Sequence, residues 1–223
     1  MGFHGNRLLR ELVSNIIRLM GVTSFVETGT CTGITTEYMA SSFPSLPIFS
    51  CEIDPQYYGP SVIRLRAHKN VTVSPESSEK FIARLISEKA LGDFPMFFLD
   101  AHWFDYWPLP DEIAAIATLP KFAVVVDDFM VPGQGQFEHD NGGGGTIGVT
   151  RTKPDSRPCS MALVGSLLPQ DCNVGYPNYD KMAAYGTPKA PHLRGHAVVV
   201  RGHASEPMSI IMQNRHYDWG VVR

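Results

Sequence analysis

Acidic residues stand directly after four short apolar segments of the chain, where carboxylates could bind a ligand or a cation. In sequence order these acids are Glu27, Glu52, Asp54, Asp100, Asp127 and Asp128. In a parallel sheet wrapped by helices, ligands bind beyond the carboxyl ends of the strands. Carboxylates at those ends can accept hydrogen bonds and can coordinate metal ions. The pattern therefore predicts a polar site at one edge of a sheet.

A glycine-containing turn follows the first apolar segment, with the sequence Glu-Thr-Gly-Thr-Cys-Thr-Gly from Glu27 to Gly33. Gly29 and Gly33 allow the backbone to turn sharply and to approach a ligand closely before a helix begins. Taken alone, this spacing is also compatible with a purely structural turn. The Glu27 carboxylate could receive a cationic amino-acid group and would repel a diphosphate.

Glu52, at the end of the second apolar segment, is well placed to accept hydrogen bonds from ribose hydroxyls. Together with the turn it predicts a nucleoside-bearing ligand, which nicotinamide enzymes and S-adenosylmethionine enzymes both bind. The glycine spacing departs from Gly-x-Gly-x-x-Gly, on which close approach to a diphosphate at a helix start depends. The sequence therefore favours S-adenosylmethionine over a nicotinamide cofactor.

Asp100, Asp127 and Asp128 close the fourth and fifth apolar segments and predict a cation site. Three carboxylates at neighbouring strand ends repel one another unless a cation or protons intervene. Mg²⁺ prefers oxygen ligands and completes its octahedron with water and substrate, which fits this set of acids. In the alternative, structural interpretation, one acid caps a helix and another is solvated.

His102, two residues after Asp100, is the first candidate for a general base, because imidazole titrates near neutral pH. A hydrogen-bonded structural role is the alternative for His102, and His139 is a more remote candidate base. The other six histidines, His4 included, lack ligand spacing and are expected in surface or structural positions.

The segments that must position these residues alternate between strand and helix patterns. Apolar residues at helical spacing predict an amphipathic first helix over 8–20, and its charged residues exclude a signal peptide or a membrane span. Strands are predicted at 23–26, 48–53, 70–73, 96–99 and 121–126, with helices at 35–42, 57–67, 77–90, 110–119 and 161–168. This order predicts an α/β fold with a doubly wound, mostly parallel sheet. Residues 197–201 and 208–212 are predicted to close it as an antiparallel C-terminal hairpin, and the glycine-rich segment 131–150 to form a lid or insertion.

Three segments, in this order, resemble motifs of class I S-adenosylmethionine-dependent methyltransferases. Residues 25–36 are similar to the first motif of that family, residues 98–103 to its fourth-strand segment and residues 124–129 to its fifth. The likeness covers about residues 20–135, and the nearest groups are the macrocin O-methyltransferase type and, more distantly, catechol O-methyltransferase. It implies a Rossmann-like methyltransferase fold, which we expect to span the chain as a single domain.

The resemblance also implies a set of cofactor contacts, with the methionine part at the first turn, the ribose at the second strand end and the adenine near 75–77. The residues concerned are Glu27, Gly29, Thr30, Gly33, Glu52, Asp54, Glu76, Ser77 and Asp100. Cys31 replaces a glycine of many first motifs, and Pro75 departs from the Gly-Asp-Ser pattern of the adenine side. In metal-dependent O-methyltransferases the metal cluster is Asp, Asp and Asn, and Asp128 stands at the Asn position.

The predicted function is Mg²⁺-assisted transfer of a methyl group from S-adenosylmethionine to a hydroxyl of a small molecule. Asp100 and His102 would be its catalytic residues. The aromatic residues at 103, 106 and 107 could stack on an aromatic or sugar-like acceptor or simply pack within the protein. An NAD-dependent oxidoreductase, a non-catalytic nucleoside-binding module and a cephalosporin-hydroxylase-like relative stay open as alternatives.

Composition narrows the class of partner. A chain of 223 residues with 43% apolar residues can bury a core and suits one domain. A net charge of −3 provides no overall basic field for nucleic acid or anionic lipid. Four cysteines without paired spacing predict reduced thiols and a cytoplasmic protein. The expected partner is a small molecule, with no nucleic acid and no membrane, and a homo-oligomer is compatible with this composition.

Overall fold

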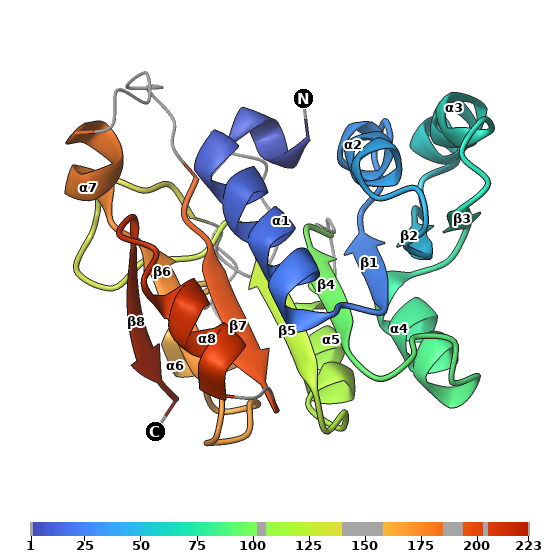
Figure 1. Ribbon diagram of the computed structural model, residues 1–223. Coiled ribbons are helices and arrows are strands. Elements are labelled where there is room, and N and C mark those ends of the chain that lie inside the picture. Colours follow the sequence, from blue (N-terminus) through green and yellow to red (C-terminus); the bar gives the residue numbers. More distant parts are fainter. Residues whose placement is uncertain (1, 102–105, 140–157, 185–193, 203–204, 223) are drawn as a thin grey trace.

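Eight strands form one sheet in the order β3-β2-β1-β4-β5-β7-β6-β8 (Figure 1). The structure is a computed structural model that describes residues 2–101, 106–139, 158–184, 194–202 and 205–222. The strands are β1 (Ser24–Thr28), β2 (Ile48–Cys51), β3 (Val71–Ser74), β4 (Pro95–Leu99), β5 (Phe122–Val126), β6 (Asn173–Pro177), β7 (Ala197–Arg201) and β8 (Tyr217–Val221). The first five are parallel. β7 is antiparallel to β5 and β6, and β8 is antiparallel to β6.

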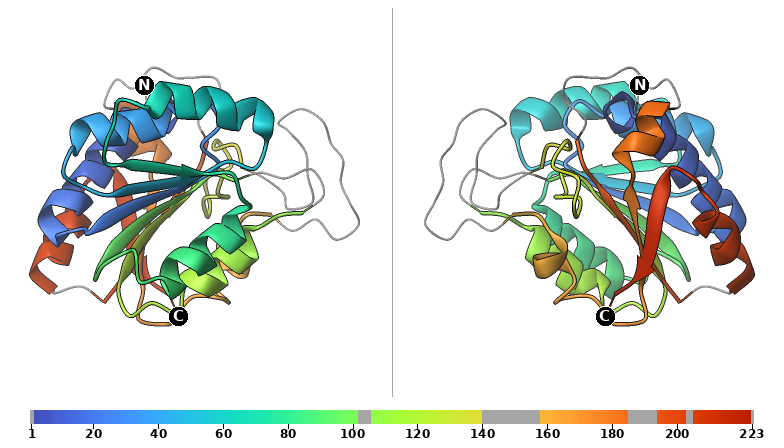
Figure 2. Two further views of the ribbon diagram at one scale, coloured as in Figure 1. Left: turned by 90° about the vertical axis from the view of Figure 1, so that its right-hand side faces the viewer. Right: turned by 90° about the vertical axis from the view of Figure 1, so that its left-hand side faces the viewer.

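Helices cover both faces of the sheet (Figure 1, Figure 2). One face carries α1 (Arg7–Met20), α2 (Ile34–Ser42) and α8 (Ser205–Met212), and α3 (Pro55–Leu65) lies beside α2. The other face carries α4 (Ser78–Ser87), α5 (Leu109–Ile116) and α6 (Met161–Val164). The short helix α7 (Tyr179–Ala184) follows β6. Alternate residues of β4 enter the two apolar cores, so its apolar run is continuous. None of the helices in the described part of the chain is both long and apolar enough to cross a membrane.

The residues before α1 form a short 3-10 turn, η1 (Phe3–Gly5). Asn6 caps α1, because its side chain accepts a hydrogen bond from the backbone N–H of Leu9 at 3.0 Å. The Phe3 ring is only 1% exposed and packs edge-to-face on Phe98, with ring centroids 4.9 Å apart. The start of the chain is therefore anchored on the sheet rather than projecting from it.

The doubly wound sheet and its antiparallel C-terminal strands confirm the prediction from sequence. The prediction that residues 208–212 form the second strand of a C-terminal hairpin is wrong, because these residues belong to α8. Met208 and Ile211, three residues apart, are buried, whereas Ile210 is exposed. This spacing is typical of a helix, but the continuous apolar run does not reveal it in the sequence. β7 pairs with β5 and β6 instead. β6 and β8 were not predicted, because Gly175 and Gly220 weaken their strand patterns.

The first part of the predicted lid, residues 131–139, packs onto the body of the protein. Val131 and Phe137 are buried and share a small apolar cluster with Leu8 and Met182. The backbone N–H of Gly195 donates to the Glu138 carbonyl oxygen at 2.8 Å. Residues 140–150 lie outside the described residues, so the lid or insertion itself stays a prediction.

Candidate functional site

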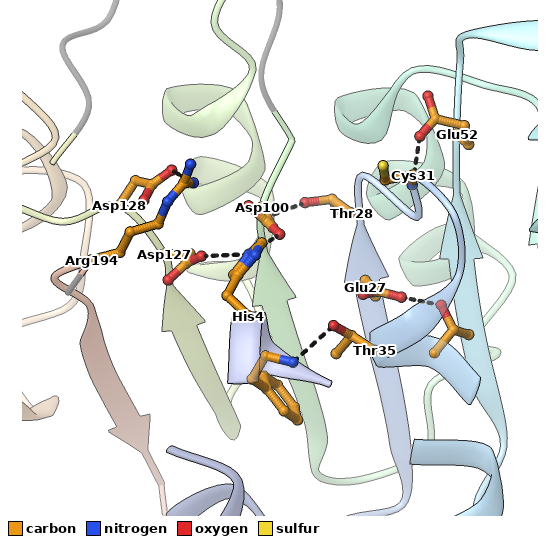
Figure 3. Close-up of polar contacts among 12 residues, drawn as sticks. His4, Glu27, Thr28, Cys31, Thr35, Glu52, Asp100, Asp127, Asp128 and Arg194 are labelled. Carbon is orange, nitrogen blue, oxygen red and sulfur yellow. Dashed lines mark hydrogen bonds and ion pairs between the residues drawn. The ribbon is translucent and has the colours of Figure 1, made fainter. Parts of the chain in front are cut away.

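The polar site lies at the carboxyl ends of β1, β4 and β5, where the direction of the crossovers reverses (Figure 3). β1 pairs with β2 on one side and with β4 on the other, and sheets of this kind bind ligands at such a switch point. A Cβ atom on Gly29 would lie 2.6 Å from the backbone oxygen of Asp100. Glycine, at φ +79°, is therefore what allows the turn after β1 to contact the end of β4.

The turn between β1 and α2 is held against β2. The backbone N–H groups of Gly29 and Thr30 donate to the Cys51 carbonyl oxygen at 3.1 and 3.0 Å. The Thr30 hydroxyl donates to the same oxygen at 3.0 Å, which buries this side chain in the protein. Cys31, at φ +48°, leaves its side chain exposed. The N–H groups of Gly29 and Thr30 and the Thr30 hydroxyl thus bond within the protein, and the contact of this turn with a cofactor stays a prediction.

Glu52 lies beside this turn, as the sequence predicts. Its Oε2 accepts a hydrogen bond from the Cys31 N–H at 2.8 Å and its Oε1 accepts one from the Asp54 N–H at 2.9 Å. Each carboxylate oxygen has a second lone pair, so Glu52 can still accept bonds from a ligand hydroxyl. The Asp54 side chain caps α3 by accepting a hydrogen bond from the Gln56 N–H at 2.8 Å.

Glu76 and Ser77, predicted for the adenine side, lie between β3 and α4. The Glu76 carboxylate pairs with Arg84 of α4 at 2.5 Å. The Ser77 hydroxyl donates to Glu79 at 2.6 Å. Both side chains therefore bond to α4 in this structure, and their contact with adenine stays a prediction.

Glu27 is buried within β1, only 2% exposed. Its Oε2 accepts hydrogen bonds from the hydroxyls of Thr36 on α2 and Ser50 on β2, the second at 3.2 Å. Burial raises the pKa of the Glu27 carboxyl to about 8, and the nearby charge of Asp100 adds to this rise. Glu27 thus fastens the turn and α2 to the sheet, and its contact with the methionine part of a cofactor stays a prediction.

The raised pKa of Glu27 predicts how stability depends on pH. The folded carboxyl keeps its proton up to about pH 8, whereas a glutamate in the unfolded chain has a pKa of 4.5. The unfolded state therefore loses the proton first, and the contribution of Glu27 to stability is lost as pH rises between these values. Between pH 6 and pH 8 the unfolding free energy of the wild-type protein should fall by about 2 kcal/mol more than that of the Glu27→Gln variant. Urea unfolding at each pH measures this.

The matched control is Glu206→Gln, which removes an exposed carboxyl from the first turn of α8. Its stability should follow the wild-type curve with pH. A Glu27→Gln variant with the wild-type slope would contradict the assignment of this pH dependence to Glu27.

Asp100 and Asp127, at the ends of β4 and β5, both contact the side chain of His4 (Figure 3). His4 Nε2 lies 2.9 Å from Asp100 Oδ2 and 3.1 Å from Asp127 Oδ2. These three side chains offer one donor atom each within 4.8 Å of one another, which could hold a metal ion. The Asp127 side chain is 4% exposed and that of His4 48%, so the group opens to solvent on the His4 side.

Charge in this group is shared between the imidazole and the two carboxyls. Hydrogen bonding to Asp100 and then to Asp127 raises the pKa of His4 to about 10. Burial raises the pKa of Asp127, although the contact with His4 opposes this rise. Without a bound cation, His4 is therefore protonated at neutral pH and cannot act as a general base there.

Asp128 lies against a different partner from its neighbour Asp127. Its Oδ2 accepts a hydrogen bond from Arg194 at 2.5 Å, and its side chain is 3% exposed. Asp128 has φ +49°, a left-handed conformation that turns it out of the strand direction of β5. Of the three aspartates predicted to hold a cation, the structure thus brings Asp100 and Asp127 together with His4 and places Asp128 beside Arg194 (Figure 3).

His4 and Arg194 are the site residues that sequence reasoning missed. His4 lies 96 residues from Asp100, and Arg194 lies 66 residues from Asp128; no ligand spacing marks either of them. The predicted base His102 and the aromatic residue at 103 lie outside the described residues. Trp107 lines a small pocket with Asp127, and the Tyr106 hydroxyl donates to Asp111.

No protein-family model and no curated protein matches the chain in sequence. Among solved structures, a Staphylococcus aureus protein described as a caffeoyl-CoA O-methyltransferase has a TM-score of 0.55 and 15% identity, over 88% of this chain and 84% of that one. The N-terminal domain of EvdMO1, solved with SAH and D-fucose, has a TM-score of 0.53 and 11% identity, over 88% and 83%. MtNAS, in complex with MTA and tNA, has a TM-score of 0.50 and 13% identity, over 90% and 62%.

At these identities the likeness establishes the fold. The chain has the Rossmann-like fold of these methyltransferase structures, and its sheet ends in the antiparallel strand β8 beside β6. The narrower resemblance to the macrocin and catechol groups stays a prediction.

Proposed function

We propose that the protein is an S-adenosylmethionine-dependent methyltransferase that acts on a hydroxyl of a small molecule. One observation carries the proposal: the Gly29 turn contacts Asp100 at the switch point of the sheet, with Glu52 beside the same turn. A ligand at this point would meet backbone groups, a ribose acceptor and a carboxylate together. The likeness to solved methyltransferases supports this function over that of an oxidoreductase.

The residues present fit an adenosyl-sulfonium donor. Glu52 retains lone pairs for ribose hydroxyls, and the partly exposed Asp100 carboxylate can attract the positive charge of the methionine part. Glu27 acts through the turn, which it fastens to Thr36 of α2. The bound donor would supply an electrophilic methyl carbon, which moves to the acceptor oxygen while sulfur keeps the bonding electron pair and a base takes the hydroxyl proton.

A divalent cation fits the buried carboxylate of Asp127 and the partly exposed carboxylate of Asp100, because neighbouring carboxylates repel each other unless positive charge lies between them. Such a cation would lower the pKa of the acceptor hydroxyl when bound. The chain's own part is to hold the two carboxylates at adjacent strand ends, through the pairing of β4 with β5. His102 stays the predicted base, and Tyr106, 48% exposed, is a candidate surface for an aromatic or sugar-like acceptor.

Calorimetry with S-adenosylhomocysteine tests the cofactor site. We expect wild-type protein to bind it, and the Glu52→Ala variant to bind more weakly by about 1–3 kcal/mol, the contribution of a hydrogen bond to a charged group. The control is Glu88→Ala, which removes an exposed carboxylate at the end of α4 and should leave the affinity unchanged.

Two results would remove the cofactor assignment. One is Glu52→Ala affinity equal to that of the wild-type protein. The other is binding of NADH without binding of S-adenosylhomocysteine, which would favour the oxidoreductase. A third result would favour the non-catalytic nucleoside-binding module: Asp100→Ala leaves cofactor affinity unchanged, and the protein transfers no methyl group to any acceptor tested.

A further inference from the structure

Three side chains from distant parts of the chain direct one donor atom each to a common point. They are His4 of η1, Asp100 after β4 and Asp127 after β5. The Nε2 atom of His4 lies 2.9 and 3.1 Å from the two carboxylate oxygens. Adjacent ligands of an octahedral ion with metal–ligand distances of about 2.1 Å are themselves about 3 Å apart. The two N–O separations are also hydrogen-bond distances, so they fit both a protonated imidazole between the carboxylates and neighbouring positions around one small divalent ion.

The His4 position is set by buried packing of the residue before it. The Phe3 ring is enclosed by Phe25, Tyr38 and Phe98. The Phe3 backbone N–H donates to the Thr35 hydroxyl at 3.0 Å. An imidazole held by an anchored neighbour is presented to the carboxylates at a fixed place, rather than reaching them by chance from a mobile terminus.

The buried carboxylate of Asp127 requires a positive charge beside it, which either a protonated His4 or a bound cation supplies. Its side chain is 4% exposed, and its Oδ2 faces the imidazole. Taking a carboxylate out of water is costly unless positive charge compensates it. Arg194, the cation beside the neighbouring Asp128, hydrogen-bonds that residue instead.

The donor set is different from the all-oxygen set that the sequence predicts. Asp128, which stands where metal-dependent relatives have Asn, is bonded to Arg194, and the imidazole nitrogen of His4 takes the third position beside Asp100. Carboxylates and water suit Mg²⁺, whereas an imidazole ligand shifts preference towards first-row transition ions. A set of one nitrogen and two oxygens therefore favours an ion such as Mn²⁺ over Mg²⁺.

We propose that His4, Asp100 and Asp127 bind a divalent first-row transition ion, with His4 as its nitrogen ligand. Use of this ion in catalysis rests on the proposed methyltransferase function, whereas ion binding itself does not. Mn²⁺ is a suitable probe because its electron paramagnetic resonance reports free ion, and pulsed spectra report nitrogen bound to the metal.

The experiment titrates the full chain, first treated with chelator and dialysed, with Mn²⁺ in the absence of cofactor and acceptor. We expect one Mn²⁺ per chain with nitrogen coupling, which an equal concentration of Mg²⁺ does not displace. His4→Gln keeps a polar side chain of similar length but offers no imidazole nitrogen. It should weaken Mn²⁺ binding about 10-fold or more and abolish the nitrogen coupling.

Two control variants locate the ligands. Asp128→Asn should leave Mn²⁺ affinity unchanged, because Asp128 contacts Arg194. His102→Gln should retain the nitrogen coupling. Loss of affinity in Asp128→Asn, or nitrogen coupling that persists in His4→Gln, would overturn the ligand assignment.

The remaining outcomes separate this proposal from the proposed function. A wild-type protein that binds S-adenosylhomocysteine but no Mn²⁺ would overturn the metal site alone, and His4 would then be only a protonated partner of the two aspartates. Displacement of Mn²⁺ by equal Mg²⁺ would overturn the choice of ion. Mn²⁺ binding with no affinity for S-adenosylhomocysteine would support the metal site and contradict the methyltransferase.

Discussion

Gly29→Ala is expected to lower the free energy of unfolding by about 2–5 kcal/mol and to weaken binding of S-adenosylhomocysteine. Alanine at the left-handed φ of +79° costs about 1–2 kcal/mol, and overpacking adds about 1–3 kcal/mol. The new Cβ would lie 2.6 Å from the backbone oxygen of Asp100 and 3.0 Å from its carbonyl carbon. Backbone atoms cannot move aside without shifting the end of β4. Urea unfolding and calorimetry measure the two effects.

Gly21→Ala is the matched control for this substitution. Gly21 ends α1 at φ +66°, and a Cβ there would meet no heavy atom within 4 Å. Only the backbone cost of about 1–2 kcal/mol should therefore appear, with cofactor affinity unchanged. Equal losses of stability in the two variants, or wild-type cofactor affinity in Gly29→Ala, would contradict the role given to the contact between β1 and β4.

Phe3→Ala is expected to cost about 3–5 kcal/mol of unfolding free energy, as for other buried aromatic residues. The Phe3 ring is 1% exposed, with its centroid 4.9 Å from that of Phe98 and 6.4 Å from that of Phe25. Its removal would also free His4 from its place beside the carboxylates, so Mn²⁺ affinity should fall together with stability. Urea unfolding and paramagnetic resonance titration give the two readouts.

Phe3→Leu is the control, because leucine keeps most of the apolar volume in the same cavity. It should cost less than half as much stability as Phe3→Ala and should retain Mn²⁺ binding. If Phe3→Ala bound Mn²⁺ with wild-type affinity at a temperature where it is folded, Phe3 would have no part in positioning His4.

Local sequence patterns predict the five parallel strands of the sheet and the edge at which the candidate site lies. Continuous apolar runs fit strands buried on both faces, as in β4 and β5, and the residues after those runs then lie at one edge. The positions of Gly29, Glu52, Asp100 and Asp127 were predicted in this way, because each depends on a local pattern. The apolar run at 208–212 gave a wrong strand prediction because it too was judged from a local pattern. Periodicity alone does not separate a short helix from a strand.

The side chains that complete the site come from segments far apart in the sequence. His4 reaches Asp100 across 96 residues of sequence, and Arg194 reaches Asp128 across 66. Neither contact has a local signature, because each depends on how η1 and the approach to β7 pack at the strand ends. The left-handed backbone of Asp128 likewise separates it from its sequence neighbour Asp127. Local residue patterns thus specify the five parallel strands and the acids at the ends of four of them, whereas packing between distant segments selects the partners of those acids.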